Sequence, residues 1–83
     1  MELTGKFRGK VVDNNDPLKR GRIRPLVPAV SEHPLAWAEP CFQYIGDQQD
    51  QYLLPPVGAN VWIEFERGDV DYPVWVGIFF SPR

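Results

Sequence analysis

The sequence predicts a single small all-β domain in which about five strands close a barrel. Nine Pro and seven Gly are spread over 83 residues, and they interrupt every window that could carry three helical turns. Between these breakers lie short runs rich in Val, Ile, Phe, Trp and Tyr, and several of them alternate with period two. Short alternating runs without long helical windows are typical of a β-barrel or sandwich.

The expected strands are separated by segments with strong turn chemistry. We expect strands near residues 7–13, 22–27, 38–44, 60–66 and 73–80. Residues 14–17 (Asn-Asn-Asp-Pro) favour a turn, because Asx side chains bond to nearby backbone and proline fixes φ. Residues 28–34 and the polar stretch 45–56 are expected to be exposed loops.

The second expected strand has one face packed against the core and one face exposed to solvent. Alternation places Ile23 and Val27 inward, and Arg22 and Arg24 outward. Pro25 falls among the inward positions, and a proline cannot donate to a sheet ladder. We therefore expect Pro25 at an edge, at a bulge or at the bend of a curled strand.

The last two runs predict a hairpin. The turn at residues 67–71 contains Gly68, which can adopt a positive φ. The side chains expected to point inward are Val61, Ile63, Phe65, Val74, Val76 and Ile78.

Three aromatic residues occupy the opposite set of positions on this hairpin. Trp62, Trp75 and Phe79 are expected to share one face with two glutamates. Aromatic side chains beside charges are enriched at interfaces, so these rings predict either a partner contact or packing beneath the 45–56 loop.

The sequence lacks the residues that a catalytic site or a metal site would need. Cys41 is the only cysteine and His33 the only histidine, which excludes an internal disulfide and a structural zinc site. We expect Cys41 to be a buried thiol and not a nucleophile, since the sequence indicates no third group that would orient a Cys–His pair.

Residues 13–24 start like a calcium-binding loop, but they lack the glycine and the final acidic residue of that motif. The Arg-Gly-Asp tripeptide at 67–69 is expected to be a plain turn rather than an adhesion motif. We expect no enzyme activity and no cofactor.

The charge pattern gives little attraction to nucleic acid. The net charge is −2 and the pI is about 5.2, although Lys19, Arg20, Arg22 and Arg24 form a local basic cluster. The alternative function is therefore a small module that binds single-stranded nucleic acid through Arg22, Arg24 and exposed aromatics. No apolar run reaches the roughly 20 residues that span a bilayer. The N-terminal residues also lack the basic and then apolar pattern of a secretory signal peptide.

Two segments carry a resemblance to a known family. Residues 5–24, which end in DPLKRGRIR, resemble the opening of the OB domain of central spike and hub proteins in contractile phage tails. Residues 54–77, LPPVGANVWIEFERGDVDYPVWVG, resemble the end of that domain. This second pattern is shared with Vgr-family spike proteins of type VI secretion and with baseplate assembly protein V. Together the segments cover more than half of the chain in the family's order.

The resemblance implies a five-stranded Greek-key OB-fold barrel over residues 1–83. It also implies a non-enzymatic assembly role in a contractile injection apparatus, with hub and spike proteins as partners and a possible homotrimer. Assembly would occur in the bacterial host cytoplasm and would place the chain in the virion tail baseplate. The expected interface residues are Trp62, Trp75, Phe79, Arg22 and Arg24.

Two departures from the family limit these expectations. In larger relatives the barrel leads into a β-helical spike, whereas this sequence ends at Arg83 just after the last expected strand. We therefore expect no membrane insertion and no lytic role for this chain alone. Relatives usually have a β-branched residue in place of Pro25, so the second strand is expected to be shorter or more sharply bent.

Overall fold

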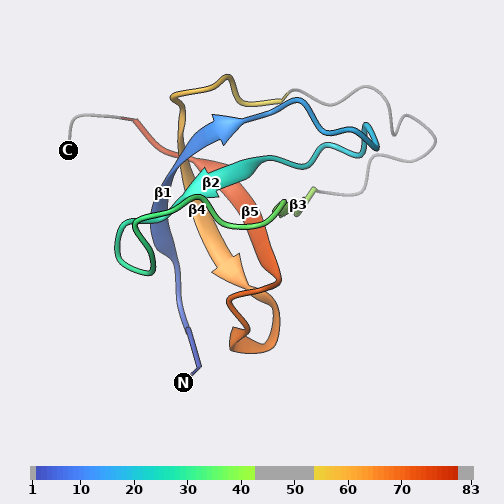
Figure 1. Ribbon diagram of the computed structural model, residues 1–83. Helices are drawn as coiled ribbons and strands as arrows, with labels where there is room; N and C mark the ends of the chain where they lie inside the picture. Colours follow the sequence, from blue (N-terminus) through green and yellow to red (C-terminus); the bar gives the residue numbers. More distant parts are fainter. Residues whose placement is uncertain (1, 43–53, 81–83) are drawn as a thin grey trace.

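The sheet has five strands that curl around one core (Figure 1). The computed structural model describes residues 2–42 and 54–80. Its elements are β1 (Phe7–Asp13), β2 (Arg24–Leu26), β3 (Glu39–Pro40), β4 (Asn60–Phe65), the 3-10 turn η1 (Glu66–Gly68) and β5 (Pro73–Ile78). The all-β prediction is confirmed, because the described segments hold strands, turns and this single 3-10 turn. The expected strands at 22–27 and 38–44 are longer than β2 and β3, and residues 43–53 lie outside the described part.

The strand order shows how the sheet closes. The order is β2-β1-β4-β5-β3, with β3 parallel to β5 and the other pairs antiparallel. An antiparallel bridge joins Ile23, next to β2, to Ala38, next to β3, through N–O distances of 3.2 Å and 2.6 Å. The two edge strands therefore meet at this point. This connectivity gives the five-stranded, partly open Greek-key barrel of an OB-fold.

Pro25 lies in the edge strand β2 opposite Val11. The register of β1 against β2 shifts between Val11 and Asp13, and Pro25 is fully buried. An edge position beside a register shift tolerates a residue without an N–H, as the sequence predicts. Ile23 and Val27 are also buried, as predicted.

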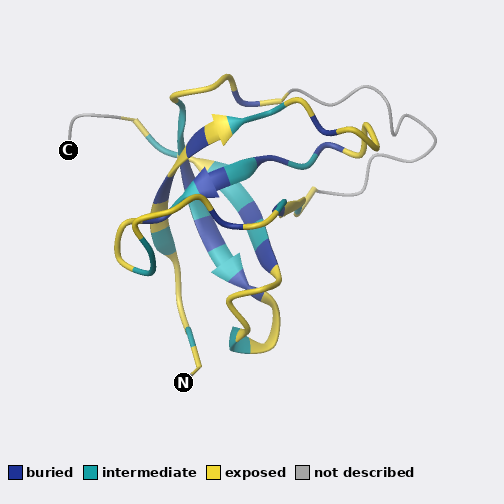
Figure 2. Ribbon diagram, viewed as in Figure 1, coloured by how far each residue is buried: buried dark blue, intermediate teal, exposed yellow. Residues whose placement is uncertain are grey.

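The predicted set of inward side chains in the last hairpin is correct for β4 and wrong for β5. Val61, Ile63 and Phe65 are buried, and Figure 2 shows buried and half-buried residues alternating along β4. In β5 the buried positions are Pro73 and Trp75, whereas Val74 and Val76 are half-buried and Ile78 is 59% exposed.

A register shift between the two hairpin strands explains this correction. Ile63 pairs with Trp75 and Trp62 pairs with Gly77, so Val76 is an extra residue without an opposite partner. The inserted residue breaks the simple alternation along β5. Because directly paired residues of two strands face the same side of the sheet, the pairing of Ile63 with Trp75 places the indole in the core.

The core is formed by residues from all parts of the barrel. Its buried hydrophobic members are Val11, Ile23, Val27, Leu35, Ala38, Val61, Ile63, Phe65 and Trp75. The expectation that Cys41 is buried is wrong, because this free cysteine is exposed. Cys41 directly follows the two-residue strand β3, and its N–H donates to the Trp75 carbonyl at 3.0 Å.

Candidate functional site

An aromatic pair capped by an arginine lies on the outer face of β1, β4 and the end of β5. The Trp62 and Phe79 ring centroids are 4.6 Å apart, and both residues are half-buried. The Arg8 guanidinium carbon lies 5.0 Å from the Trp62 centroid and 4.9 Å from the Phe79 centroid. Arg8 is the direct cross-strand partner of Trp62, so sheet register holds the cation over both rings. We call these three residues the Arg8–Trp62–Phe79 cluster.

An open groove of about 370 Å³ adjoins this cluster. It is lined by Arg8, Gly9, Lys10, Leu26, Pro28, Asn60 and Phe79. Among residues 2–42 and 54–80, neither Arg8 nor Lys10 forms an ion pair or a hydrogen bond through its side chain. Two cations therefore border an apolar groove whose described lining contains no carboxylate. Such a site suits an apolar segment that carries negative charge.

Gly9 also lines this groove, although a side chain at its position would point away from the groove and into the core. A Cβ at this position would lie 3.2 Å from Ile63 Cγ1, from the Leu26 carbonyl oxygen and from Val27 Cγ2. The sheet backbone and its neighbours can approach this closely only because residue 9 has no side chain. A side chain at position 9 would therefore crowd the core residues Ile63 and Val27 rather than fill the groove.

Trp75 is not part of the outer cluster, which corrects its expected outward orientation. Its side chain is 7% exposed, and its Nε1–H donates to the Gly21 carbonyl at 3.0 Å. Its indole ring also meets Phe42 edge-on, at 5.7 Å between centroids. Trp75 therefore connects β5 to the β1–β2 loop from inside the barrel.

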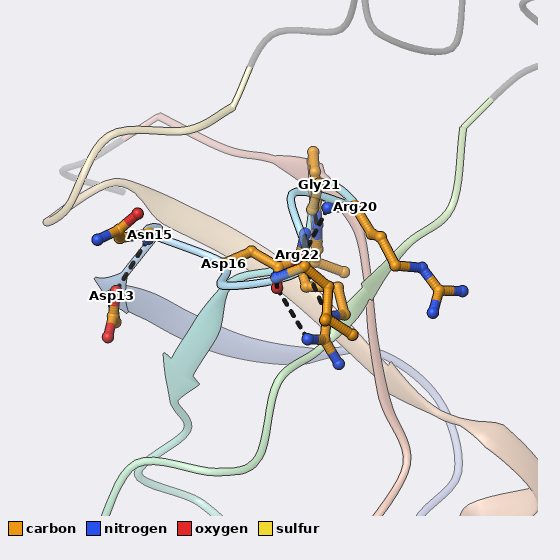
Figure 3. A network of polar contacts seen from close by, with 8 residues as sticks. Asp13, Asn15, Asp16, Arg20, Gly21 and Arg22 are labelled. Carbon is orange, nitrogen blue, oxygen red and sulfur yellow. Dashed lines mark hydrogen bonds and ion pairs between the residues drawn. The ribbon is translucent and has the colours of Figure 1, made fainter.

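A buried carboxylate organises that loop (Figure 3). Asp16 accepts hydrogen bonds from the backbone N–H groups of Leu18 and Arg20 at 2.9 Å each and from that of Arg22 at 3.3 Å. The Arg22 side chain adds Nε at 3.0 Å and Nη2 at 2.8 Å. This geometry is a bidentate ion pair, and Asp16 is the buried charged residue of the described part.

These bonds change the acidity of both partners. Hydrogen bonding to the Arg22 side chain holds the pKa of Asp16 far below its usual range, against the opposing effect of desolvation. The backbone N–H donors lower this pKa further. The Asp16 carboxylate also raises the pKa of Arg22. All of these contacts favour the charged forms.

Arg22 and Arg24 are less available than the sequence suggests. Arg22 is occupied by Asp16 and also lies over the Trp37 ring at 5.6 Å. Arg24 donates from Nε to the Leu35 carbonyl at 3.0 Å. Both side chains are half-buried and bonded within the barrel, so the basic cluster offers fewer free cations to a phosphate backbone than its composition indicates.

The other candidate chemistry does not assemble in the described part. Cys41 is exposed after β3, and His33 is exposed in the 28–34 loop. Residues 2–42 and 54–80 contain no group of three His, Cys, Asp or Glu placed to hold a metal ion. The same residues include no helix long and apolar enough to cross a membrane. The Arg-Gly-Asp tripeptide lies in the β4–β5 turn, where Arg67 and Gly68 have positive φ values of 57° and 75°.

Two residues of these sites are missed by sequence reasoning. Alternation along residues 7–13 places Arg8 outward, but it does not reveal that β4 is the neighbour that brings Trp62 beside it. Asp16 is recognisable as a turn residue, yet its pairing with Arg22 depends on a loop that reverses between them. The sequence does predict Trp62 and Phe79 together, and the structure brings these two rings into contact.

Comparison with known proteins agrees with this architecture. A family model described as the type VI secretion system/phage-baseplate injector OB domain matches residues 7–80. None of the curated proteins compared with the chain matches it. The family match spans all five strands and includes both the Arg8–Trp62–Phe79 cluster and the Asp16 loop.

Proposed function

The chain belongs to the family of type VI secretion system and phage-baseplate injector OB domains, and we propose that it is a non-enzymatic assembly part of a phage tail baseplate. A structural role in an injection apparatus follows from that membership. Its location in the virion tail, its hub or spike partner and a threefold arrangement of copies are the finer parts of the proposal.

The observation that carries the proposed contact is the Arg8–Trp62–Phe79 cluster. Its rings pack on each other outside the barrel, separated from the core by the sheet itself. Tryptophan and arginine are the residues that most often dominate binding energy at protein interfaces, particularly when a partner excludes water from them. We therefore assign the Arg8–Trp62–Phe79 cluster to contact with the hub or spike protein.

The energetics agree with an interface role. Each aromatic side chain buries 150–250 Å² when it is fully covered, and apolar area contributes about 25 cal/mol per Å². Covering the exposed remainder of the two rings would therefore contribute a few kcal/mol at most, about the size of one interface hot spot.

Co-purification tests this assignment. The tagged chain is produced together with candidate hub and spike proteins of the same injection apparatus, and Trp62→Ser and Phe79→Ser are compared with Tyr72→Ser. Tyr72 is a matched control, because it is an exposed aromatic (59%) in the β4–β5 turn. We expect the first two variants to lose the partner while they still fold and melt cooperatively. Retention of the partner by both variants would refute the assignment.

A further inference from the structure

The groove beside the Arg8–Trp62–Phe79 cluster and the tip of the β4–β5 hairpin have opposite charge. The tip, residues 66–72, contains the carboxylates of Glu66, Asp69 and Asp71 and the single cation Arg67. Among the described residues none of these carboxylates forms an ion pair. The groove is bordered by Arg8 and Lys10, which also lack ion pairs within that part of the chain.

The tip also has the shape and the apolar content that such a groove requires. Val70 is 39% exposed and Tyr72 is 59% exposed, so apolar side chains alternate with the acids. Backbone bonds from Asp69 N to Glu66 O and from Tyr72 N to Asp69 O, both 3.0 Å, fix the turn. The Asp71 N–H also donates to Asp69 Oδ1 at 2.9 Å. A tip that is ordered before binding loses little conformational entropy on docking.

One molecule cannot satisfy both surfaces by itself. The groove residue Asn60 begins β4 and the tip follows its end, so six residues at about 3.3 Å each separate them by about 20 Å. Figure 1 shows the hairpin turn at the end of the barrel opposite the start of β4. The complementary charges can therefore meet only between two molecules.

We propose that the β4–β5 tip of one copy docks into the Arg8–Lys10 groove of a second copy. The contact is heterologous, because two different patches meet. Repeating this contact either closes a ring or builds an open filament of subunits. Lys10 and Asp71 are the charges that bring the two surfaces together. The groove shares Arg8 and Phe79 with the Arg8–Trp62–Phe79 cluster, whereas Lys10 and Asp71 lie outside that cluster, so variants at Lys10 and Asp71 distinguish this inference from the contact with a hub or spike protein.

The expected association is weak and sensitive to salt. A seven-residue tip covers less area than a standard interface, which places the contact among transient ones. Its charges are exposed, so they are screened at high ionic strength. We expect the purified chain to self-associate between about 10 µM and 1 mM at 50 mM salt, and to do so at least several-fold less at 500 mM salt.

Analytical ultracentrifugation with charge-reversal variants tests the proposal. Lys10→Glu and Asp71→Lys should each weaken self-association at least tenfold. An equimolar mixture of the two variants should associate again, because the reversed groove then meets the reversed tip. Arg20→Glu is the matched control: it makes the same charge change as Lys10→Glu at an exposed position of the β1–β2 loop and should associate like the wild type.

Two-dimensional amide NMR of the wild type at increasing concentration locates the surfaces. Resonances of Gly9, Lys10 and Asn60 should shift together with those of residues 66–72. A chain that stays monomeric to 1 mM would refute the proposal. Association that Asp71→Lys leaves unchanged would also refute it, since another segment would then occupy the groove. Co-purification with the hub or spike protein that persists in Lys10→Glu would leave the proposed function intact while this inference is tested alone.

Discussion

Replacing Trp75 by Ala tests the packing assignment that differs most from the sequence-based expectation. The structure places this indole in the core, 7% exposed, with its Nε1–H bonded to the Gly21 carbonyl at 3.0 Å. An outward interface residue could be truncated with little loss of stability, whereas a core residue could not. The substitution therefore separates the two placements.

The expected loss is large relative to the stability of the domain. Removal of a buried Trp side chain costs about 3–5 kcal/mol through lost transfer energy and the remaining cavity. An 83-residue domain at about 0.05–0.15 kcal/mol per residue has about 4–12 kcal/mol in total. Trp75→Ala is therefore expected to remove a quarter or more of the stability. The milder Trp75→Phe keeps a ring but removes the donor to Gly21, which should cost about 1–3 kcal/mol.

Urea denaturation followed by far-ultraviolet circular dichroism measures these losses without depending on tryptophan fluorescence. Trp62→Ala is the matched control, since Trp62 is the half-buried tryptophan of the outer cluster. Its expected loss is about 1–2.5 kcal/mol, because it gives up one aromatic pair and one cation–π contact. Equal stability of Trp75→Ala and the wild type, or a larger loss in Trp62→Ala, would show that the two indoles are assigned to the wrong faces.

Further predictions concern the core, the hairpin turn, the Asp16 loop and nucleic acid. Phe65→Ala, which opens a cavity at a 6% exposed position, should cost about 3–5 kcal/mol in urea denaturation; cooperative melting at the wild-type temperature would contradict this. Gly68→Ala should lower stability by about 1–2 kcal/mol in the same assay, because φ is 75° and the new Cβ would lie 3.0 Å from Glu2 Cβ. The lowered pKa of Asp16 adds stability that is present above its ordinary value of 3.8 and is lost as pH falls below it; the wild-type melting temperature should therefore fall below about pH 4 more steeply than that of Asp16→Asn, and parallel curves would contradict the role of the ion pair. Oligo-dT should bind more weakly than about 10 µM at 150 mM salt, and tighter binding in fluorescence anisotropy would favour the nucleic-acid alternative.

The positions of Pro and Gly and the alternation of apolar with polar residues predict the strands well where only one of the two alternating sets is apolar. In β4, Val61, Ile63 and Phe65 are apolar, whereas the opposite face carries Asn60 and Glu64 beside Trp62, so only one face can be buried. In β5, both sets of alternating positions are apolar, so periodicity cannot decide between them. The register shift at Val76, which depends on pairing with β4, decides it instead.

The candidate site is predicted only in part, because it depends on contacts between distant segments. Trp62 and Phe79 are recognisable as exposed aromatics, whereas Arg8 joins them through a strand pairing over more than fifty residues. In the sequence Arg22 resembles a free cation in a basic cluster, whereas in the structure the loop brings it into an ion pair with Asp16. Charge counts along a sequence therefore overestimate how many cations remain available at a surface.

Photo-crosslinking in assembled particles tests the proposed role most directly. The chain is produced during infection with the photoreactive residue p-benzoylphenylalanine at position 79, and irradiated, purified particles are analysed by mass spectrometry. The control carries the same residue at position 18, where Leu18 is 59% exposed on the β1–β2 loop, away from the Arg8–Trp62–Phe79 cluster. The account predicts that the chain is present in the particles and that position 79, but not position 18, forms a crosslink to a hub or spike protein. Absence of the chain from purified particles, or crosslinks from position 18 alone, would contradict it.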